Sequence, residues 1–232
     1  MDRAHLETRR FLIVTGKGGV GKTTVCAAEA LALAHKGKRV LIALCNAKER
    51  LSKMFGSDVV GSDVVPVAKN VWAVNMDPER ALEEYGEMVL RSRSLNALLF
   101  SNKYTRALFR GVPGMHEWAM LGKAWWHTTE VLPNGDDRFD VVILDAPATG
   151  HGLDMLRVPK VILDVVPPGL LRRDAERAWM AMRDSDCRFL TQPDVGRRRA
   201  LDLATTLCQA DRTSERVDQL TNMRDQLRES YS

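Results

Sequence analysis

The stretch FLIVTGKGGVGKTTV, residues 11 to 25, decides the fold. Its first five residues form a continuous apolar, β-branched run, which is typical of a strand buried on both faces of a parallel sheet. After the glycine-rich loop, TTVCAAEALALAHKGK predicts a helix that is capped by Gly37. RVLIALC, residues 39–45, predicts a second buried strand. The three segments form a β-loop-α-β unit, with which an α/β fold begins.

Later segments continue this pattern. Further strands are predicted at 70–76, at 139–145 and, as a short one, at 188–192. The segment of about 77–137 has helical patterns and predicts a helical insertion on the sheet, and helical periodicity returns at 174–184 and 197–209. The charged tail, about 211–232, is typical of a solvated or frayed helix. We therefore expect one domain over 1–232 with a doubly wound, mostly parallel sheet.

Composition restricts the function class only weakly. The net charge is +4, and the basic residues are dispersed among 30 acids, which permits nucleic-acid binding without indicating it. The four cysteines lack metal spacing and are expected to be reduced thiols: Cys26, Cys45, Cys187 and Cys208. The amino terminus lacks the apolar core of a signal peptide, and no apolar run approaches the roughly 20 residues of a membrane span. We expect a cytoplasmic protein.

The glycine-rich loop satisfies G-x-x-x-x-G-K-[ST] between a predicted strand and a predicted helix. Its backbone N–H groups and the positive end of the helix dipole are suited to phosphate oxygens. Lys22 is expected to reach the β- and γ-phosphates, and Thr23 to ligate Mg²⁺. The predicted phosphate-binding residues are Gly16, Lys17, Gly18, Gly19, Val20, Gly21, Lys22, Thr23 and Thr24. The alternative, a plain glycine turn, does not explain this context.

FDVVILDAPATGHG, residues 139–152, predicts the other half of the site. A strand ending in Asp145 brings a carboxylate to the carboxyl edge of the sheet, where it can hold a Mg²⁺-bound water beside Thr23. The alternative is that Asp145 caps a turn. The small residues from Ala146 to Gly152 are expected to move with the γ-phosphate.

These two motifs together resemble the ArsA-like ATPases, the family of arsenite-pump-driving subunits and tail-anchored-protein targeting factors. Lys17 matches the second lysine of the deviant P-loop G-K-G-G-V-G-K-T, and DAPATGHG matches the family's later segment. MDPERALEEY at 76–85, VPGMHEWAMLGK at 112–123 and LDMLRVP at 153–159 extend the resemblance to roughly residues 10–160. The MinD/ParA proteins and the nitrogenase iron protein match the loop alone.

The resemblance implies a P-loop NTPase fold, ATP and Mg²⁺, and a dimer, either a homodimer or a heterodimer with a paralogue. Lys17 would reach the phosphates of the facing subunit; the alternative is a surface lysine. The family also implies a helical subdomain whose apolar surface binds a partner. The candidate surface residues, which we weigh as core more than as a client groove, are Met88, Val89, Leu90, Leu95, Leu98, Leu99, Phe100, Leu108 and Phe109.

The chain departs from the family at the residue that activates water. The family's second strand ends in S-T-D-P-A-H, and alignment of residues 40–56 places Asn46 at its catalytic Asp. Asparagine cannot accept the proton, and loss of a general base typically costs on the order of 10²- to 10⁴-fold. Glu49 is a weaker substitute, and positioning alone would leave slow hydrolysis. The predicted catalytic set is Lys17, Asn46 and Asp145.

The carboxyl-terminal part departs too, because no clear strand ending in an adenine-reading asparagine follows Val166. The sheet is shortened, the tail is divergent, or the chain is half of a larger assembly. No counterparts of arsenite-binding cysteines or of a C-x-x-C zinc site stand at matching positions. We expect an ATPase switch of the ArsA-like family; the alternatives are a pseudo-ATPase that regulates an active paralogue and, less favoured, a ParA/MinD-like partitioning switch.

Overall fold

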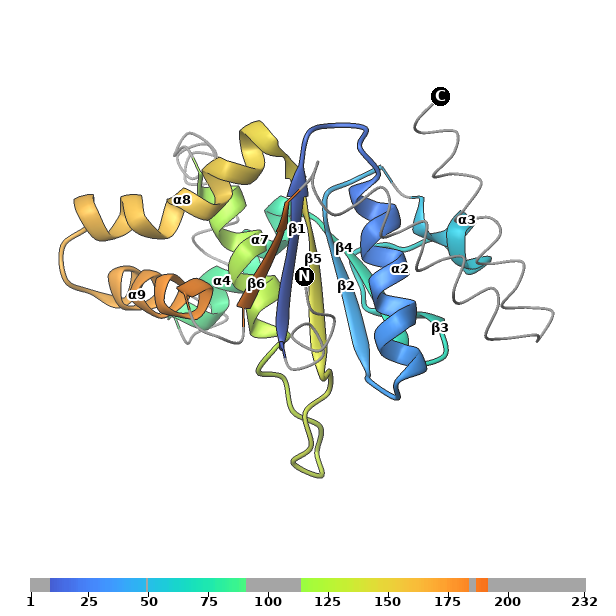
Figure 1. Cartoon of the computed structure of the whole chain (residues 1–232). Helices are drawn as coiled ribbons and strands as arrows, with labels where there is room; N and C mark the ends of the chain where they lie inside the picture. Colours follow the sequence, from blue (N-terminus) through green and yellow to red (C-terminus); the bar gives the residue numbers. More distant parts are fainter. Residues whose placement is uncertain (1–8, 49, 91–113, 184–186, 192–232) are drawn as a thin grey trace.

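The computed structural model describes residues 9–48, 50–90, 114–183 and 187–191, and these form a mostly parallel sheet covered by helices (Figure 1). The strands are β1 (Phe11–Gly16), β2 (Val40–Cys45), β3 (Val65–Ala68), β4 (Val71–Met76), β5 (Val141–Ala148) and β6 (Cys187–Thr191). The helices are α2 (Lys22–His35), α3 (Leu51–Phe55), α4 (Pro78–Leu90), α7 (Met115–Trp126), α8 (Thr149–Val165) and α9 (Leu170–Arg183).

The six strands lie in the order β3-β4-β2-β5-β1-β6. All neighbouring pairs are parallel except β3 and β4. The sequence analysis missed β3, because a four-residue strand that contains Pro66 carries almost no periodic signal. Its edge position explains why the proline is tolerated there. The predicted α/β class and mostly parallel sheet are confirmed.

Helices cover both faces of the sheet, as a doubly wound fold requires (Figure 1). Alternate residues of β1 face opposite layers: Leu12 and Val14 pack into the cluster that contains α2 and α3, and Phe11 and Ile13 into the cluster that contains residues of α4, α7, α8 and α9. All six residues of β1 are buried. This two-sided burial is the reason that the strand reads as a continuous apolar run.

Helix α2 packs closely on the sheet through small side chains. Ala27, Ala28 and Ala30 are buried, and the helix ends at His35. Gly37 follows the C-cap with φ +83°, a left-handed conformation that favours glycine. The helix stop predicted at this glycine is therefore confirmed.

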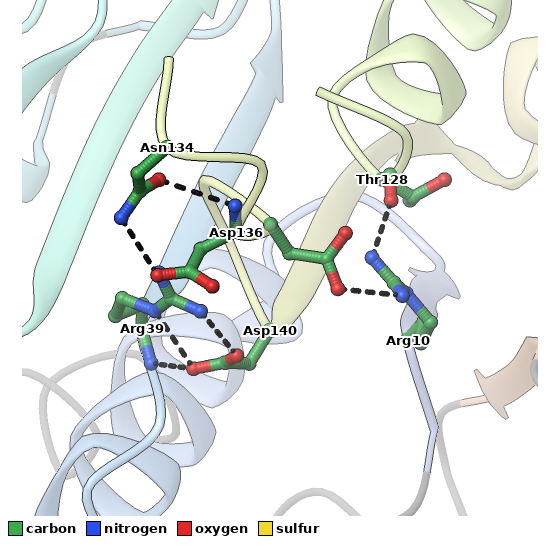
Figure 2. Close-up of polar contacts among 7 residues, drawn as sticks. Arg10, Arg39, Thr128, Asn134, Asp136 and Asp140 are labelled. Carbon is green, nitrogen blue, oxygen red and sulfur yellow. Dashed lines mark hydrogen bonds and ion pairs between the residues drawn. The ribbon is translucent and has the colours of Figure 1, made fainter. Parts of the chain in front are cut away.

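Arginine–carboxylate contacts close the amino edge of the sheet (Figure 2). The Arg39 guanidinium donates to both carboxylate oxygens of Asp140, at 2.8 Å and 3.2 Å, and the Arg39 N–H donates to the same carboxylate at 2.7 Å. Arg10 donates to Asp137 at 2.9 Å and to the Thr128 carbonyl at 2.7 Å. These contacts fasten the 127–140 connection to the ends of β1 and β2.

Two helices of the predicted insertion, α4 and α7, pack against each other and on the sheet. Tyr85 and Trp118 meet edge to face at 6.1 Å between ring centroids. Residues 91–113 of the predicted insertion, the helical segment predicted at 197–209 and the charged tail lie outside the described residues. The side chains of the candidate client surface are likewise outside the description, so that interpretation remains a prediction.

Candidate functional site

The glycine-rich loop leaves β1 and enters α2 without a side-chain cap. Gly21, the N-cap residue, has φ +82°, and Gly19 has φ +78°. These left-handed conformations are compatible with glycine and strained for other residues. The first turn of α2 contains no acidic side chain. The positive end of this helix, which has no side-chain cap, therefore suits an anion.

Two lysines belong to this loop. The Lys22 ammonium donates to the Lys17 carbonyl at 3.2 Å, so its side chain folds back along the loop. Lys17 itself is exposed, as are Gly18 and Gly19. The loop thus presents positive charge and backbone amides at the surface of the carboxyl edge.

Thr23 and Asp145 meet at the base of the loop. The Thr23 hydroxyl donates to Asp145 Oδ2 at 2.5 Å. Asp145 is only 4% exposed, and this burial raises its pKa to about 6, against the lowering effects of the Thr23 hydrogen bond and the Lys22 charge. Hydroxyl and carboxylate oxygens are the ligand types that Mg²⁺ prefers, so this pair can hold the ion directly and through water.

The structure corrects the predicted end of the strand that carries Asp145. β5 continues to Ala148, and α8 begins at Thr149, so the segment predicted to move is strand and helix in this conformation. The pairing of β5 with β1 shifts in register between Val14 and Gly16. The sequence analysis placed the strand end too early because alanine and proline are weak strand formers.

A buried hydroxyl lies beneath this segment and was missed by the sequence analysis. Thr15 Oγ1 is buried and has no hydrogen-bond partner among the described residues. A Cβ placed on Gly152 would approach Thr15 Oγ1 to 3.1 Å and the Pro147 carbonyl oxygen to 2.6 Å. Gly152 therefore allows the close approach of the start of α8 to the end of β1.

Asn46 follows β2 at the same edge. Its φ of +46° is left-handed, a conformation that asparagine tolerates better than most residues. Its N–H donates to the Met76 carbonyl at 3.0 Å, and the side chain is exposed. The register pairs Leu44 of β2 with Asp145 of β5, and Val14 of β1 pairs with the same Asp145. The loop, Asp145 and Asn46 are thus brought to one edge by three neighbouring strands.

The predicted phosphate loop residues, from Gly16 to Thr24, are contiguous here, although Thr24 is buried. Glu49, the substitute base, lies outside the described residues. Cys26 and Cys45 are free and buried, and burial together with the nearby Asp145 charge raises the pKa of both thiols. Cys187 lies in β6, and Cys208 is outside the description.

Two further absences apply only to the described part of the chain. No cluster of three or more histidine, cysteine, aspartate or glutamate side chains suits a metal ion there. Within the same residues, no helix has the length and apolarity that a membrane crossing demands.

Comparison with known proteins supports the resemblance to the ArsA-like ATPases independently of the site geometry. The model of the anion-transporting ATPase family matches residues 9–227. The chain is 31% identical to ATPase GET3 of Kluyveromyces lactis over 163 residues, which cover 67% of this chain and 46% of that protein. It is 27% identical to ATPase BagA of Mycobacterium tuberculosis, covering 75% and 52%, and 29% identical to the arsenical pump-driving ATPase of Escherichia coli, covering 64% and 25%. The chain spans about half the length, or less, of these curated relatives.

Proposed function

The chain belongs to the anion-transporting ATPase family, and we propose that it binds ATP with Mg²⁺ and acts as a nucleotide-dependent switch. The observation that carries the proposal is the 2.5 Å contact between Thr23 and Asp145 at the base of an uncapped, glycine-rich helix entry. Hydroxyl, carboxylate, lysine and backbone amides are together the donor set that a Mg²⁺-nucleotide requires.

The residues fit this ligand. The loop from Gly16 to Thr24 would hold the phosphates, with Lys22 at their charge, and Thr23 and Asp145 would hold Mg²⁺. When bound, the metal would neutralise phosphate charge as a Lewis acid. The buried Asp145 would meet that cation in its ionised form, because a nearby positive charge lowers the pKa of a carboxyl group.

The partner lies on the exposed side of the loop in this proposal. Lys17 is exposed, and its carbonyl accepts a hydrogen bond from the Lys22 ammonium. We propose that Lys17 reaches the phosphates of a facing subunit, which makes the protein a homodimer or a heterodimer with a paralogue. Nucleotide state would then be coupled to partner binding through the helical layer of α4 and α7.

A second function is favoured by one residue. Asn46 stands where the family has its general base, so the chain would bind ATP and hydrolyse it slowly or not at all. In this form it would serve as a regulatory subunit of an active paralogue. A steady-state phosphate-release assay, with the Lys22→Ala variant as blank, separates the two functions: a rate equal to the blank favours the regulatory subunit.

The nucleotide site itself is tested by calorimetry with Mg·ATP. We expect wild-type protein to bind and Lys22→Ala to lose at least 100-fold in affinity, because the variant lacks the cation at the phosphates. Lys36→Ala is the matched control, since Lys36 follows the opposite end of the same helix. Equal affinity of wild type and Lys22→Ala would contradict the assignment of the phosphate loop.

A further inference from the structure

The side-chain amide of Asn75, in β4, forms two hydrogen bonds with the backbone of Ala47, in the loop that follows β2; this pair of hydrogen bonds is called the clasp below. Asn75 Oδ1 accepts the N–H of Ala47 at 3.1 Å, and Asn75 Nδ2 donates to the carbonyl of Ala47 at 2.9 Å. Both backbone polar groups of Ala47 are therefore bonded to one side chain. The Ala47 side chain packs against the core cluster beneath, which fixes the residue from another direction.

The clasp extends the sheet beyond its last backbone pair. The ladder between β2 and β4 ends at Cys45 and Met76, and the Asn46 N–H still reaches the Met76 carbonyl at 3.0 Å. One residue further, the Asn75 carboxamide takes the place of a peptide group, because it carries one acceptor and a donor in the same plane. Asn46 is thus held between two bonded neighbours in its left-handed conformation.

The clasp is in register with the candidate site. Leu44 pairs with Asn75 on one side and with Asp145 on the other. Asn75, Leu44 and Asp145 therefore form one row across three parallel strands. Any displacement of the loop from Asn75 moves Asn46 relative to that row, and not the phosphate loop, which leaves from β1.

We propose that Asn75 is a positioning residue, which holds Asn46 at the carboxyl edge through both backbone groups of Ala47. The inference rests on the proposed nucleotide function, in which Asn46 stands at the position of the family's general base. Asn75 touches neither nucleotide nor metal in this proposal, and it acts only through Ala47 and Asn46. Loss of the clasp should lower turnover and leave ATP affinity unchanged.

The first test measures the clasp directly, without nucleotide. Amide hydrogen exchange of residues 46 and 47 is compared in wild type, Asn75→Ala and Asn75→Asp. We expect about 10-fold faster exchange at Ala47 in Asn75→Ala, since two hydrogen bonds are lost. Asn75→Asp keeps the size and the acceptor but cannot donate when ionised, so its effect should be smaller. Unchanged exchange at Ala47 in both variants would overturn the inference, whatever the chain does with ATP.

The second test measures phosphate release and calorimetric ATP affinity in the same variants, in wild-type and Asn46→Asp backgrounds. We expect kcat to fall about 10-fold in Asn75→Ala, with KM and ATP affinity within about twofold. Asn70→Ala is the control. Asn70 stands at the other end of β4 with φ +60°, a conformation that alanine tolerates less well, and its carbonyl accepts the Val40 N–H. This variant is therefore also expected to perturb β2 and β4. Its kcat should not change.

The outcomes separate the inference from the proposed function. Faster exchange at Ala47 with an unchanged kcat in both backgrounds overturns the positioning role alone. An equal fall of kcat in Asn70→Ala also overturns it, because general loosening of the strands would then explain the effect. Failure of the wild-type chain to bind Mg·ATP contradicts the proposed function, and with it the positioning role.

Discussion

The two edges of the sheet shift the pKa of a carboxyl group in opposite directions. At the amino edge, Asp140 receives three hydrogen bonds from Arg39, and these lower its pKa (Figure 2). At the carboxyl edge, Asp145 is buried with a hydroxyl as its hydrogen-bond donor, and burial raises its pKa to about 6. Both acids belong to the same part of the chain: Asp140 directly precedes β5, and Asp145 lies within it. The amino edge is therefore compensated within the chain, whereas the carboxyl edge is suited to an external cation.

The two pKa shifts make the folding stability depend on pH in opposite directions. The folded pKa of Asp140 lies below its ordinary 3.8, so its contribution to stability is present above 3.8 and is lost as pH falls through the folded value. The folded pKa of Asp145 lies above 3.8, so the folded state binds the extra proton between 3.8 and about 6. Stability from Asp145 therefore falls as pH rises through that range.

The largest expected effect concerns catalysis at the carboxyl edge. Asn46→Asp should raise phosphate release by roughly 10²- to 10⁴-fold, because a carboxylate can accept the proton of the attacking water. Aspartate also tolerates the left-handed backbone of this position. Steady-state phosphate release is the measurement, and Asn46→Ala is the control that should give no rise. No increase, while Mg·ATP remains bound, would contradict the alignment of Asn46 with the general base.

The next effect tests the buried charge. Asp145→Asn should raise the free energy of unfolding above pH 7 by up to about 3 kcal/mol, the equivalent of a pKa shift from 3.8 to about 6. The gain should vanish near pH 4, where Asp145 of the wild type is protonated when folded. Urea unfolding at both pH values measures this, and calorimetry should show weaker Mg·ATP binding. A variant less stable than wild type above pH 7 would contradict the claim that the buried, ionised Asp145 lowers the stability of the fold.

The smallest effect concerns the amino edge. Asp140→Asn should lower the free energy of unfolding at pH 7 by about 1–2 kcal/mol, because a partly exposed ion pair with several hydrogen bonds is lost. The loss of unfolding free energy should shrink below pH 4. As pH falls, this variant therefore gains stability relative to wild type, whereas Asp145→Asn loses its advantage. Urea unfolding provides the measurement, and ATP affinity serves as the internal control. A weaker ATP affinity in this variant would contradict the conclusion that the amino edge serves stability and only the carboxyl edge serves nucleotide binding.

Periodic and motif-bearing parts of the chain were predictable. β1, α2 and β2 lie within about one residue of their predicted bounds because two-sided burial and an alanine-rich helix leave strong patterns. β6 at 187–191 agrees with the weak prediction at 188–192. β3 was missed, and β5 and α8 extend through residues 146–152, which were expected to move with the γ-phosphate. Short stretches, and stretches that contain alanine, glycine and proline, take their structure from their neighbours.

The sequence by itself predicted the phosphate loop and Asp145 from strand signals and motif spacing, and the role of Asn46 from alignment with the family's second strand. Only the tertiary structure decided which of their neighbours matter. Asn75 reads as one polar residue in a strand, yet register brings it beside Ala47. Asp140 and Asp145 read alike, yet one meets Arg39 and the other is buried. Hydrogen-bond partners and burial depend on strand order, which residues distant in sequence fix together.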